Sequence, residues 1–164
     1  PFLDTSVDTF NQAMHFNVGT AYAMTRICIP LMMESAGEGS IVNISSVAGE
    51  KPTPCFSTYG TAKGALSLLT RELAQEFAPK VRVNAIAVGS TKTDALNTVL
   101  TEEIEQTMVD LTPMARLGEV EDIALGALYL ASPAGSYITG EVLAINGGLE
   151  RLNMQMPRAF GGMG

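Results

Sequence analysis

The chain has 164 residues, of which 46% are hydrophobic and 16% are charged, and its formal net charge is −7 at pH 7. A chain of this length can bury roughly 70% of the surface that its unfolded form exposes, and this composition excludes intrinsic disorder. The acidic balance leaves no basic surface for nucleic acid or for an anionic membrane.

A membrane-spanning helix and a disulfide framework are not expected either. No apolar run reaches the ~20 residues that a helix needs to cross a bilayer. Cys28 and Cys55 are too few for a disulfide scaffold, and no CxxC pair is present to bind zinc. We therefore expect a cytoplasmic protein with free thiols and no metal. The first residue is Pro1 rather than Met, which suggests a processed or truncated polypeptide.

Long helical stretches alternate with short β-branched runs, which is the pattern of parallel βαβ units. The first helix is predicted to begin near Ser6, because Thr5-Ser6-Val7-Asp8 is a capping-box arrangement, in which a hydroxyl and a carboxylate satisfy the free amides of the first turn. It runs to about Met33. Ser40–Ser45 follows as a short strand with apolar side chains on both faces, which is typical of a buried parallel strand.

Five further elements complete the prediction. In chain order they are the helix Thr58–Phe77, the strand Val81–Ala87, the helices near Thr101–Leu111 and Val120–Ala131, and the strand Glu141–Ile145. The three strands and four helices predict a single α/β domain over residues 1–164, as part of a Rossmann-like, doubly wound parallel sheet. Three strands are few for this class, which suggests that part of the sheet is missing.

Tyr59 and Lys63 form the first candidate catalytic pair. They lie four residues apart on a predicted helix, so both side chains lie on one face, one turn apart. A phenol is a poor base at neutral pH, and a nearby ammonium stabilises its ionised form. Tyr59 can therefore act as a general acid/base with Lys63 as its electrostatic support. Two unrelated surface residues on a helix would show the same spacing, so the pair alone is a weak signal.

Ser45, Ser46 and Asn17 are the other polar candidates. Ser45-Ser46 ends the first predicted strand, where open α/β sheets bind ligands and where a hydroxyl can hydrogen-bond a substrate oxygen. The same pair is common in helix caps and turns. Asn17 lies inside the first helix, where Asn is unfavourable because its side chain competes for backbone groups. It is either a solvent-exposed residue or a local break in the helix that holds a water.

In combination, these segments resemble the short-chain dehydrogenase/reductase family. The strand Gly39–Ser46, Ala48-Gly49 and the segment Tyr59–Lys63 are similar to its catalytic segment, with the usual spacing from Ser46 to Tyr59. The other matching segments, between about Thr5 and Gly148, are Asn17-Val18, Arg82–Gly89 with Thr93, Arg116–Gly118 with Asp122–Ala124, Tyr137–Gly140 and Asn146–Gly148. Random agreement at this many ordered positions is very unlikely.

The resemblance implies a role for each matching residue. Tyr59 transfers the proton to or from the substrate oxygen, while Lys63 stabilises the ionised phenol and hydrogen-bonds the nicotinamide ribose. Ser46 orients and polarises the substrate oxygen. Asn17 holds a water that links Lys63 to solvent. The implied contacts to the nicotinamide carboxamide are the backbone around Gly89 and Thr91 and the hydroxyl of Thr93.

The chain also departs from the family pattern. Val88 and Val120 replace usual prolines and Asn146 replaces a usual aspartate, none of which is a catalytic side chain. The larger departure is that the family's first βαβ unit, with the glycine-rich turn that binds the cofactor pyrophosphate, is absent. Residues 161–164 are no substitute, since they follow no predicted strand. The residue that separates NAD from NADP is missing with that unit.

The leading hypothesis is an oxidoreductase that transfers a hydride between NAD or NADP and a secondary alcohol or ketone. Asp94–Thr112 resembles the mobile substrate lid of the family. The segments that look most like bacterial hydroxysteroid, or bile-acid, dehydrogenases are Val81–Val88, Lys92–Leu96 and Thr98–Thr101. In the family, the two long helices and the last strand form subunit interfaces, so the resemblance implies a homodimer or homotetramer. The expected partners are a small-molecule substrate and a second copy of the chain.

Two alternatives stay open. Without a pyrophosphate site, the chain could be a non-catalytic, truncated fragment that only packs and oligomerises. A Ser/Lys hydrolase built on Ser46 and Lys63 is the other alternative, but it needs an oxyanion hole and leaves Tyr59 without a role.

Overall fold

The structure, a computed structural model, describes residues 1–98, 100–154, 156–158 and 160 of the chain. The glycine-rich end at residues 161–164 therefore lies outside the described part. Among the described residues, no helix is both long and apolar enough to span a bilayer.

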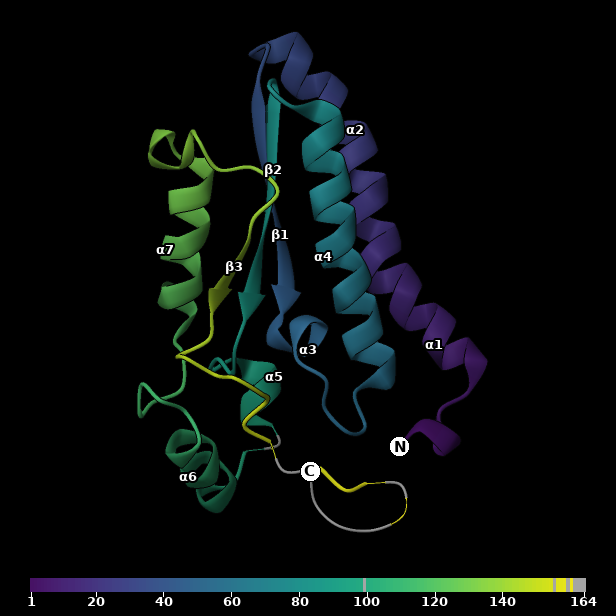
Figure 1. The fold of residues 1–164 in the computed structure, drawn as a ribbon, viewed down its shortest axis with the longest axis vertical. Coiled ribbons are helices and arrows are strands. Elements are labelled where there is room, and N and C mark those ends of the chain that lie inside the picture. The colour runs from purple at the N-terminus through teal and green to yellow at the C-terminus, as the bar shows by residue number, and fades with distance from the viewer. Residues whose placement is uncertain (99, 155, 159, 161–164) are drawn as a thin grey trace.

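Three parallel strands form the centre of the molecule (Figure 1). They are β1 (Gly39–Ser46), β2 (Val81–Val88) and β3 (Val142–Ile145), in the order β1-β2-β3. Ser46 pairs with Val88, and Val88 pairs with Ile145, so the carboxyl ends of the three strands meet at one edge of the sheet. The middle strand β2 is buried over most of its length, as expected for a strand covered on both faces.

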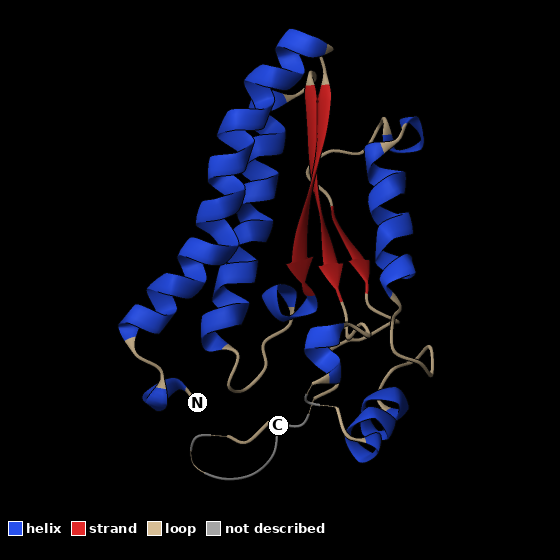
Figure 2. Ribbon diagram, turned by 180° about the vertical axis from the view of Figure 1, so that it is seen from behind, coloured by secondary structure: helices blue, strands red, loops and turns tan. Residues whose placement is uncertain are grey.

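Helices cover both faces of this sheet, as Figure 2 shows from behind. Helix α7 (Val120–Ala131) packs on one face, and α4 (Ser57–Phe77) and α2 (Thr20–Ser35) pack on the other. The core between α2, α4 and the sheet is apolar, and its buried members are Ile29, Leu73, Ala74, Val81 and Val83. These layers confirm the predicted α/β, Rossmann-like parallel sheet.

The first predicted helix is interrupted in the structure. Helix α1 (Val7–Met14) continues into α2 through a π-helical turn at His15–Gly19, and α2 ends at Ser35 rather than at Met33. Asn17 is at the centre of this turn. The local break in the helix that the sequence allows at Asn17 is therefore present. Short π-helical insertions of this kind are frequent at functional sites.

The start of this helix differs in one detail from the prediction. Ser6 is the N-cap, and its hydroxyl accepts the amide of Thr9 at 3.1 Å. The predicted capping box Thr5–Asp8 is wrong, because the helix begins at Val7 and its third residue, which must answer the cap, is Thr9 and not a carboxylate.

The remaining predicted elements agree with the structure to within a residue or two. Helix α6 covers Glu102–Asp110, and β3 begins one residue late because the amide of Glu141 donates to the Asn84 side chain at 3.0 Å. Very short helices carry no hydrophobic period and are not predicted. They are α3 (Val47–Glu50), α5 (Asp94–Asn97) and the 3₁₀ turns Phe2–Asp4 and Pro133–Gly135.

Candidate active site

Tyr59 and Lys63 lie one turn apart at the start of α4. The Lys63 Nζ stands over the Tyr59 ring, 5.7 Å from its centroid, so the two side chains share one face of the helix. Nζ also donates a 2.8 Å hydrogen bond to the carbonyl oxygen of Ile44 in β1. The Tyr59 side chain stays 40% exposed, and Phe56 packs edge-on against its ring.

The Lys63 amine occupies a half-buried position at this edge of the sheet. Burial lowers the pKa of Lys63 from its ordinary value, because a low-dielectric surrounding disfavours the charged form. The Ile44 carbonyl replaces part of the lost hydration. In the described part of the chain, no carboxylate forms an ion pair with this amine. The amine therefore lies over the Tyr59 ring without an acidic partner among the described residues.

Ser46 ends β1 and is only 8% exposed. Its Oγ accepts the amide of Ala48 at 3.2 Å and so caps α3. The capping role that the sequence also allows is thus present. It is compatible with catalysis, because a hydroxyl that accepts an amide proton keeps its own proton to donate. No acceptor among the described residues takes that proton, which leaves it available for a substrate oxygen.

Three glycines let α3 lie against the first turns of α4. A Cβ added to Gly49 would lie 2.7 Å from the Gly64 nitrogen, and one added to Gly60 would lie 2.8 Å from the carbonyl oxygen of Ala48. The contact holds the end of β1 against the helical turn that carries Tyr59. This contact is not predicted from the sequence. The glycines inside the helix are the signal that could have indicated it, because glycine there costs about 1 kcal/mol relative to alanine and often has a packing reason.

Gly60→Ala is expected to destabilise the protein by about 1–3 kcal/mol, because the added methyl group overpacks the contact between α3 and α4. Helix propensity alone predicts the opposite, a gain of about 1 kcal/mol. Gly64→Ala is the matched control, since its nearest contact would be 3.1 Å, and a smaller loss is expected. Denaturant unfolding measures both variants. A Gly60→Ala protein as stable as the unaltered one would contradict this account of the contact.

Asn17 is half-buried in the π-helical turn, which packs against α4. Its Nδ2 donates to the carbonyl oxygen of Ala13 at 2.9 Å. The side chain thus competes for a backbone acceptor of the preceding turn, as expected for Asn within a helix. The water that links it to Lys63 stays a prediction.

The loop after β2 carries the predicted cofactor contacts. A Cβ added to Gly89 would lie 2.6 Å from the Cα of Asn146, so only glycine fits between the ends of β2 and β3. Gly89 and Thr91 line a cavity of about 310 Å³ at the carboxyl edge of the sheet. Thr93 is not among its lining residues, and its hydroxyl caps α5 by accepting the amide of Leu96 at 3.2 Å.

The stretch predicted as the substrate lid, Asp94–Thr112, contains α5 and α6. Both helices lie at the carboxyl end of the sheet (Figure 1). Val99, within this stretch, lies outside the described residues. In the ranges that the structure does describe, His, Cys, Asp and Glu side chains do not gather in groups of three or more that could hold a metal.

Ser45 has a role that the sequence does not reveal. It is 2% exposed, and its Oγ donates to the Lys63 carbonyl oxygen and lies close to the Ser67 Oγ, both at 3.0 Å. Asn43 donates to the Thr70 hydroxyl at 2.9 Å on the same side of β1. These buried bonds hold α4 against β1 and thereby determine the position of Lys63 along the strand, relative to its carboxyl end.

A charged pair borders the cavity beside Gly89. Arg116 donates two hydrogen bonds to Asp122, of 2.7 and 2.9 Å, and Asp122 also accepts the amide of Glu119 at the start of α7. The hydrogen bond from Arg116, followed by the bond from the Glu119 amide, lowers the pKa of the Asp122 carboxyl to about 2.

This lowered pKa predicts a loss of stability in acid. A carboxyl with a lower pKa in the folded than in the unfolded state stabilises the fold above its unfolded pKa, and this contribution disappears as the pH falls through the folded pKa. The stabilisation from Asp122 should disappear between its ordinary 3.8 and about 2. Asp122→Asn should flatten the dependence of unfolding free energy on pH in this window, whereas Glu121→Gln, one residue earlier, should not. Equal slopes for the unaltered protein and Asp122→Asn would contradict the assignment.

Comparison with known proteins identifies the family of this chain. The family model described as enoyl-(acyl carrier protein) reductase matches residues 1–150. An uncharacterised oxidoreductase of Mycobacterium tuberculosis is 49% identical over 156 residues, which are 94% of this chain and 59% of that protein. The chain belongs to the short-chain dehydrogenase/reductase family. The resemblance inferred from the sequence is therefore confirmed.

Other short-chain dehydrogenases/reductases are similar in sequence and in fold. The 7α-hydroxysteroid dehydrogenase of Escherichia coli is 41% identical over 155 residues, 93% of this chain and 60% of that protein. The solved structure of a 7α-hydroxysteroid dehydrogenase with NADH and 7-oxo glycochenodeoxycholic acid has a TM-score of 0.84 at 40% identity, covering 91% of this chain and 59% of that one. Further similar structures contain NADH or NADP. The chain thus spans about 60% of the length of these relatives.

Proposed function

We propose that this chain is the catalytic portion of an oxidoreductase that transfers a hydride between a nicotinamide cofactor, NAD or NADP, and a secondary alcohol or ketone. The observation that carries the proposal is the Lys63 amine, held over the Tyr59 ring by the Ile44 carbonyl at the end of β1. Membership of a family whose solved structures contain NADH or NADP supports it.

The proposed oxidation begins with the ionised Tyr59 accepting the proton of the substrate hydroxyl. Ser46, whose own proton is free, donates a hydrogen bond to the same oxygen and orients it. The carbon–oxygen bond becomes a carbonyl as the hydride leaves the carbinol carbon. A bound nicotinamide ring would supply the hydride acceptor for oxidation and the hydride donor for reduction. Reduction uses the same residues, with Tyr59 returning the proton.

Lys63 stabilises the charge on Tyr59 during this cycle, because no carboxylate in the described part of the chain neutralises its amine. The same amine is the group that we propose to hydrogen-bond the cofactor ribose. Asn17, in a helical turn that packs against α4, would hold the water through which Lys63 exchanges protons with solvent.

The residues present fit the nicotinamide end of the cofactor. Gly89 and Thr91 line a cavity beyond the carboxyl ends of β2 and β3, where open α/β sheets bind ligands. We place the carboxamide beside their backbone, with the Thr93 hydroxyl, which accepts an amide but keeps its own proton, as a further donor. Over the described ranges, no glycine-rich turn leads from a strand into a helix as a pyrophosphate site requires.

A hydroxysteroid or bile acid is the substrate class that we propose. The similarity to 7α-hydroxysteroid dehydrogenases supports it. An apolar cavity of about 330 Å³ between α6 and the C-terminal tail, lined in part by Ile104, Met108, Met154 and Met156, is suited to a rigid apolar molecule. Methionine side chains adapt readily to such shapes.

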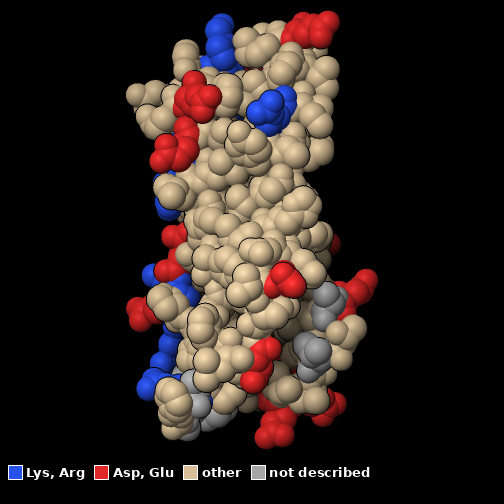
Figure 3. All heavy atoms as spheres, turned by 90° about the vertical axis from the view of Figure 1, so that its right-hand side faces the viewer, with Lys and Arg blue, Asp and Glu red and all other residues tan. Residues whose placement is uncertain are grey.

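We also propose a cytoplasmic homodimer or homotetramer. The side formed by α1 and α2 carries few charged side chains across its middle (Figure 3). Its large exposed apolar residues include Tyr22, Met24, Ile27 and Leu31. Apolar area of this kind, rimmed by charge, is typical of a protein interface. Sedimentation of the intact natural protein as a monomer would contradict this proposal.

The alternative that the missing pyrophosphate turn favours is a non-catalytic fragment that only packs and oligomerises. The hydrolase alternative gains no support, because the Ser46 hydroxyl and the Lys63 amine are bonded to different groups rather than to each other.

Fluorescence titration with NADH and NADPH, followed by turnover of a panel of hydroxysteroids, separates these functions. The intact natural protein should bind at least one cofactor and oxidise at least one steroid alcohol. The 164-residue chain alone should bind more weakly, because no pyrophosphate turn is present over its described ranges. Binding of neither cofactor by the intact protein would favour the non-catalytic alternative.

A further inference from the structure

The tail after β3 is tied into the structure by one buried side chain. Asn153 is 1% exposed. Its Oδ1 accepts the proton of the Ser90 hydroxyl at 2.5 Å, and its Nδ2 donates to the Met108 carbonyl oxygen at 3.0 Å and to the Thr112 hydroxyl at 2.9 Å. One amide group thus joins three segments: the tail, the end of α6 and the loop after β2.

The loop and the helix joined in this way both belong to the proposed site. Ser90 lies between Gly89 and Thr91, whose backbone we place beside the nicotinamide. Met108 lies in the last turn of α6 and Thr112 lies two residues after its end, both in the predicted substrate lid. Breaking these bonds would leave the buried Asn153 amide without its partners, which is costly away from water, whereas the Thr112 hydroxyl would keep its 2.7 Å bond to the Met108 carbonyl oxygen. The position of the loop and the position of α6 therefore depend on each other.

A second contact between the same two segments lies at the surface. The Lys92 Nζ is 2.7 Å from the Glu105 Oε1, but the two side chains are 42% and 38% exposed. Exposed ion pairs are screened by salt and contribute little. The buried Asn153 amide is therefore the stronger link between loop and lid.

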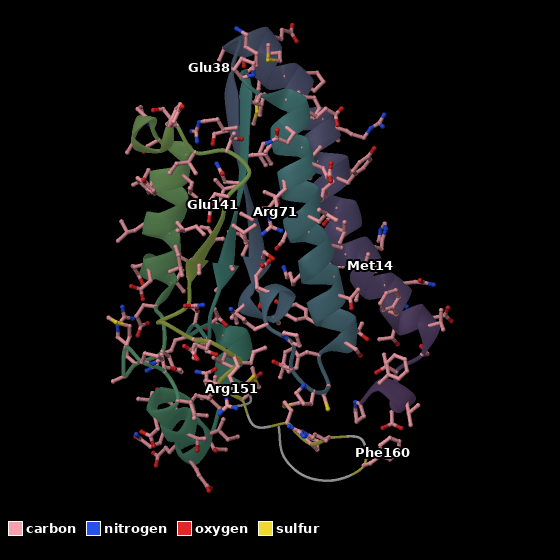
Figure 4. All side chains as sticks on the ribbon, viewed as in Figure 1. Met14, Glu38, Arg71, Glu141, Arg151 and Phe160 are labelled. Carbon is pink, nitrogen blue, oxygen red and sulfur yellow. The ribbon has the colours of Figure 1, made fainter. Side chains whose placement is uncertain are left out.

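The tail itself borders the cavity under α6. Arg151, near the start of the tail, lies at the end of the molecule that carries α5 and α6 (Figure 4). Asn153, Met154 and Met156 line the apolar cavity together with residues of α6. The tail also reaches the loop before α4, where the Cys55 thiol donates to the Pro157 carbonyl oxygen at 3.3 Å.

We propose that Asn153 is a positioning residue that couples cofactor binding at the loop Gly89–Thr91 to the ordering of α6 over the substrate cavity. This inference rests on the proposed function. Cofactor beside the loop fixes Ser90, the Ser90 hydroxyl fixes the Asn153 amide, and that amide fixes the end of α6. The expected consequence is that the cofactor and the substrate strengthen each other's binding, since such coupling is reciprocal.

Hydrogen–deuterium exchange of the α6 amides in the intact natural protein, with and without saturating NADH or NADPH, tests this coupling. Cofactor should slow their exchange in the unaltered protein. Asn153→Ala and Ser90→Ala should each abolish the slowing and raise the steroid KM by about tenfold with a smaller effect on kcat. The double variant should add little to either, because both residues act through one bond. Lys92→Gln, which removes only the surface contact, and Ser90→Thr, which keeps the hydroxyl, should retain the slowing.

The outcomes distinguish this inference from the function on which it rests. Failure of the unaltered protein to bind either cofactor would overturn both. Cofactor binding and turnover with α6 exchange unchanged, or with the slowing intact in Ser90→Ala, would overturn the role of Asn153 alone. Ser90→Ala keeps the buried amide in place, so the test holds even if Asn153→Ala does not fold.

Discussion

Tyr59→Phe is expected to lower kcat for alcohol oxidation by about 10²- to 10⁴-fold, because the ring stays in place while the proton acceptor is lost. The fold should be unaffected, since the side chain is 40% exposed and its hydroxyl has no hydrogen-bond partner among the described residues. Steady-state kinetics and thermal unfolding measure the two effects. Tyr22→Phe, on the exposed face of α2, is the matched control and should leave kcat unchanged.

A small effect of Tyr59→Phe on kcat would also discriminate between the proposed functions. Tyr59→Phe with kcat close to that of the unaltered protein would remove the phenol from the mechanism. Retained activity of that variant on an ester or amide substrate would instead support the hydrolase alternative, in which Tyr59 has no role.

Lys63→Met is expected to reduce kcat by a similar factor without lowering the unfolding temperature. Activity falls because the charge that stabilises the ionised Tyr59 is removed. Stability should hold because burial lowers the pKa of Lys63, so the folded state disfavours its charged form. An apolar side chain of similar length removes that unfavourable burial and loses only the hydrogen bond to the Ile44 carbonyl.

The control for this variant is Lys51→Met, in the exposed loop before α4, which should affect neither kcat nor stability. Kinetics and differential scanning calorimetry apply to both proteins. Lys63→Met with a markedly lower unfolding temperature and an unchanged kcat would show that the amine serves the fold rather than the reaction.

Much of the fold is predictable from the sequence because its long elements carry strong periodic patterns. The predicted helix end at Phe77 and strand start at Val81 are confirmed, since a proline between them and a β-branched run mark both positions clearly. The carboxyl ends of parallel strands meet at one edge, so Ser46 and Gly89 follow from topology once the strands are placed.

The positions that escape prediction depend on contacts that no local pattern records. Glycine is unfavourable within a helix, and Gly60 is explained only by the Ala48 carbonyl oxygen, which leaves no room for a Cβ. Asn153 looks like one polar residue in an irregular tail, yet its three partners are 41, 45 and 63 residues away along the chain. Ser45 and Ser46 form one motif in the sequence but have separate partners in the structure, α4 for the first and α3 for the second.

Transfer of deuterium from substrate to cofactor shows whether the protein catalyses hydride transfer with Tyr59 as its acid/base. The intact natural protein is incubated with oxidised nicotinamide cofactor and a hydroxysteroid that is deuterated at its carbinol carbon, and the reduced cofactor is examined by mass spectrometry and proton NMR. The account predicts one deuterium on the nicotinamide ring for each ketone formed, at a rate that Tyr59→Phe lowers by at least about a hundredfold. Ketone formation without deuterium in the cofactor, or transfer at an unchanged rate in Tyr59→Phe, would contradict it.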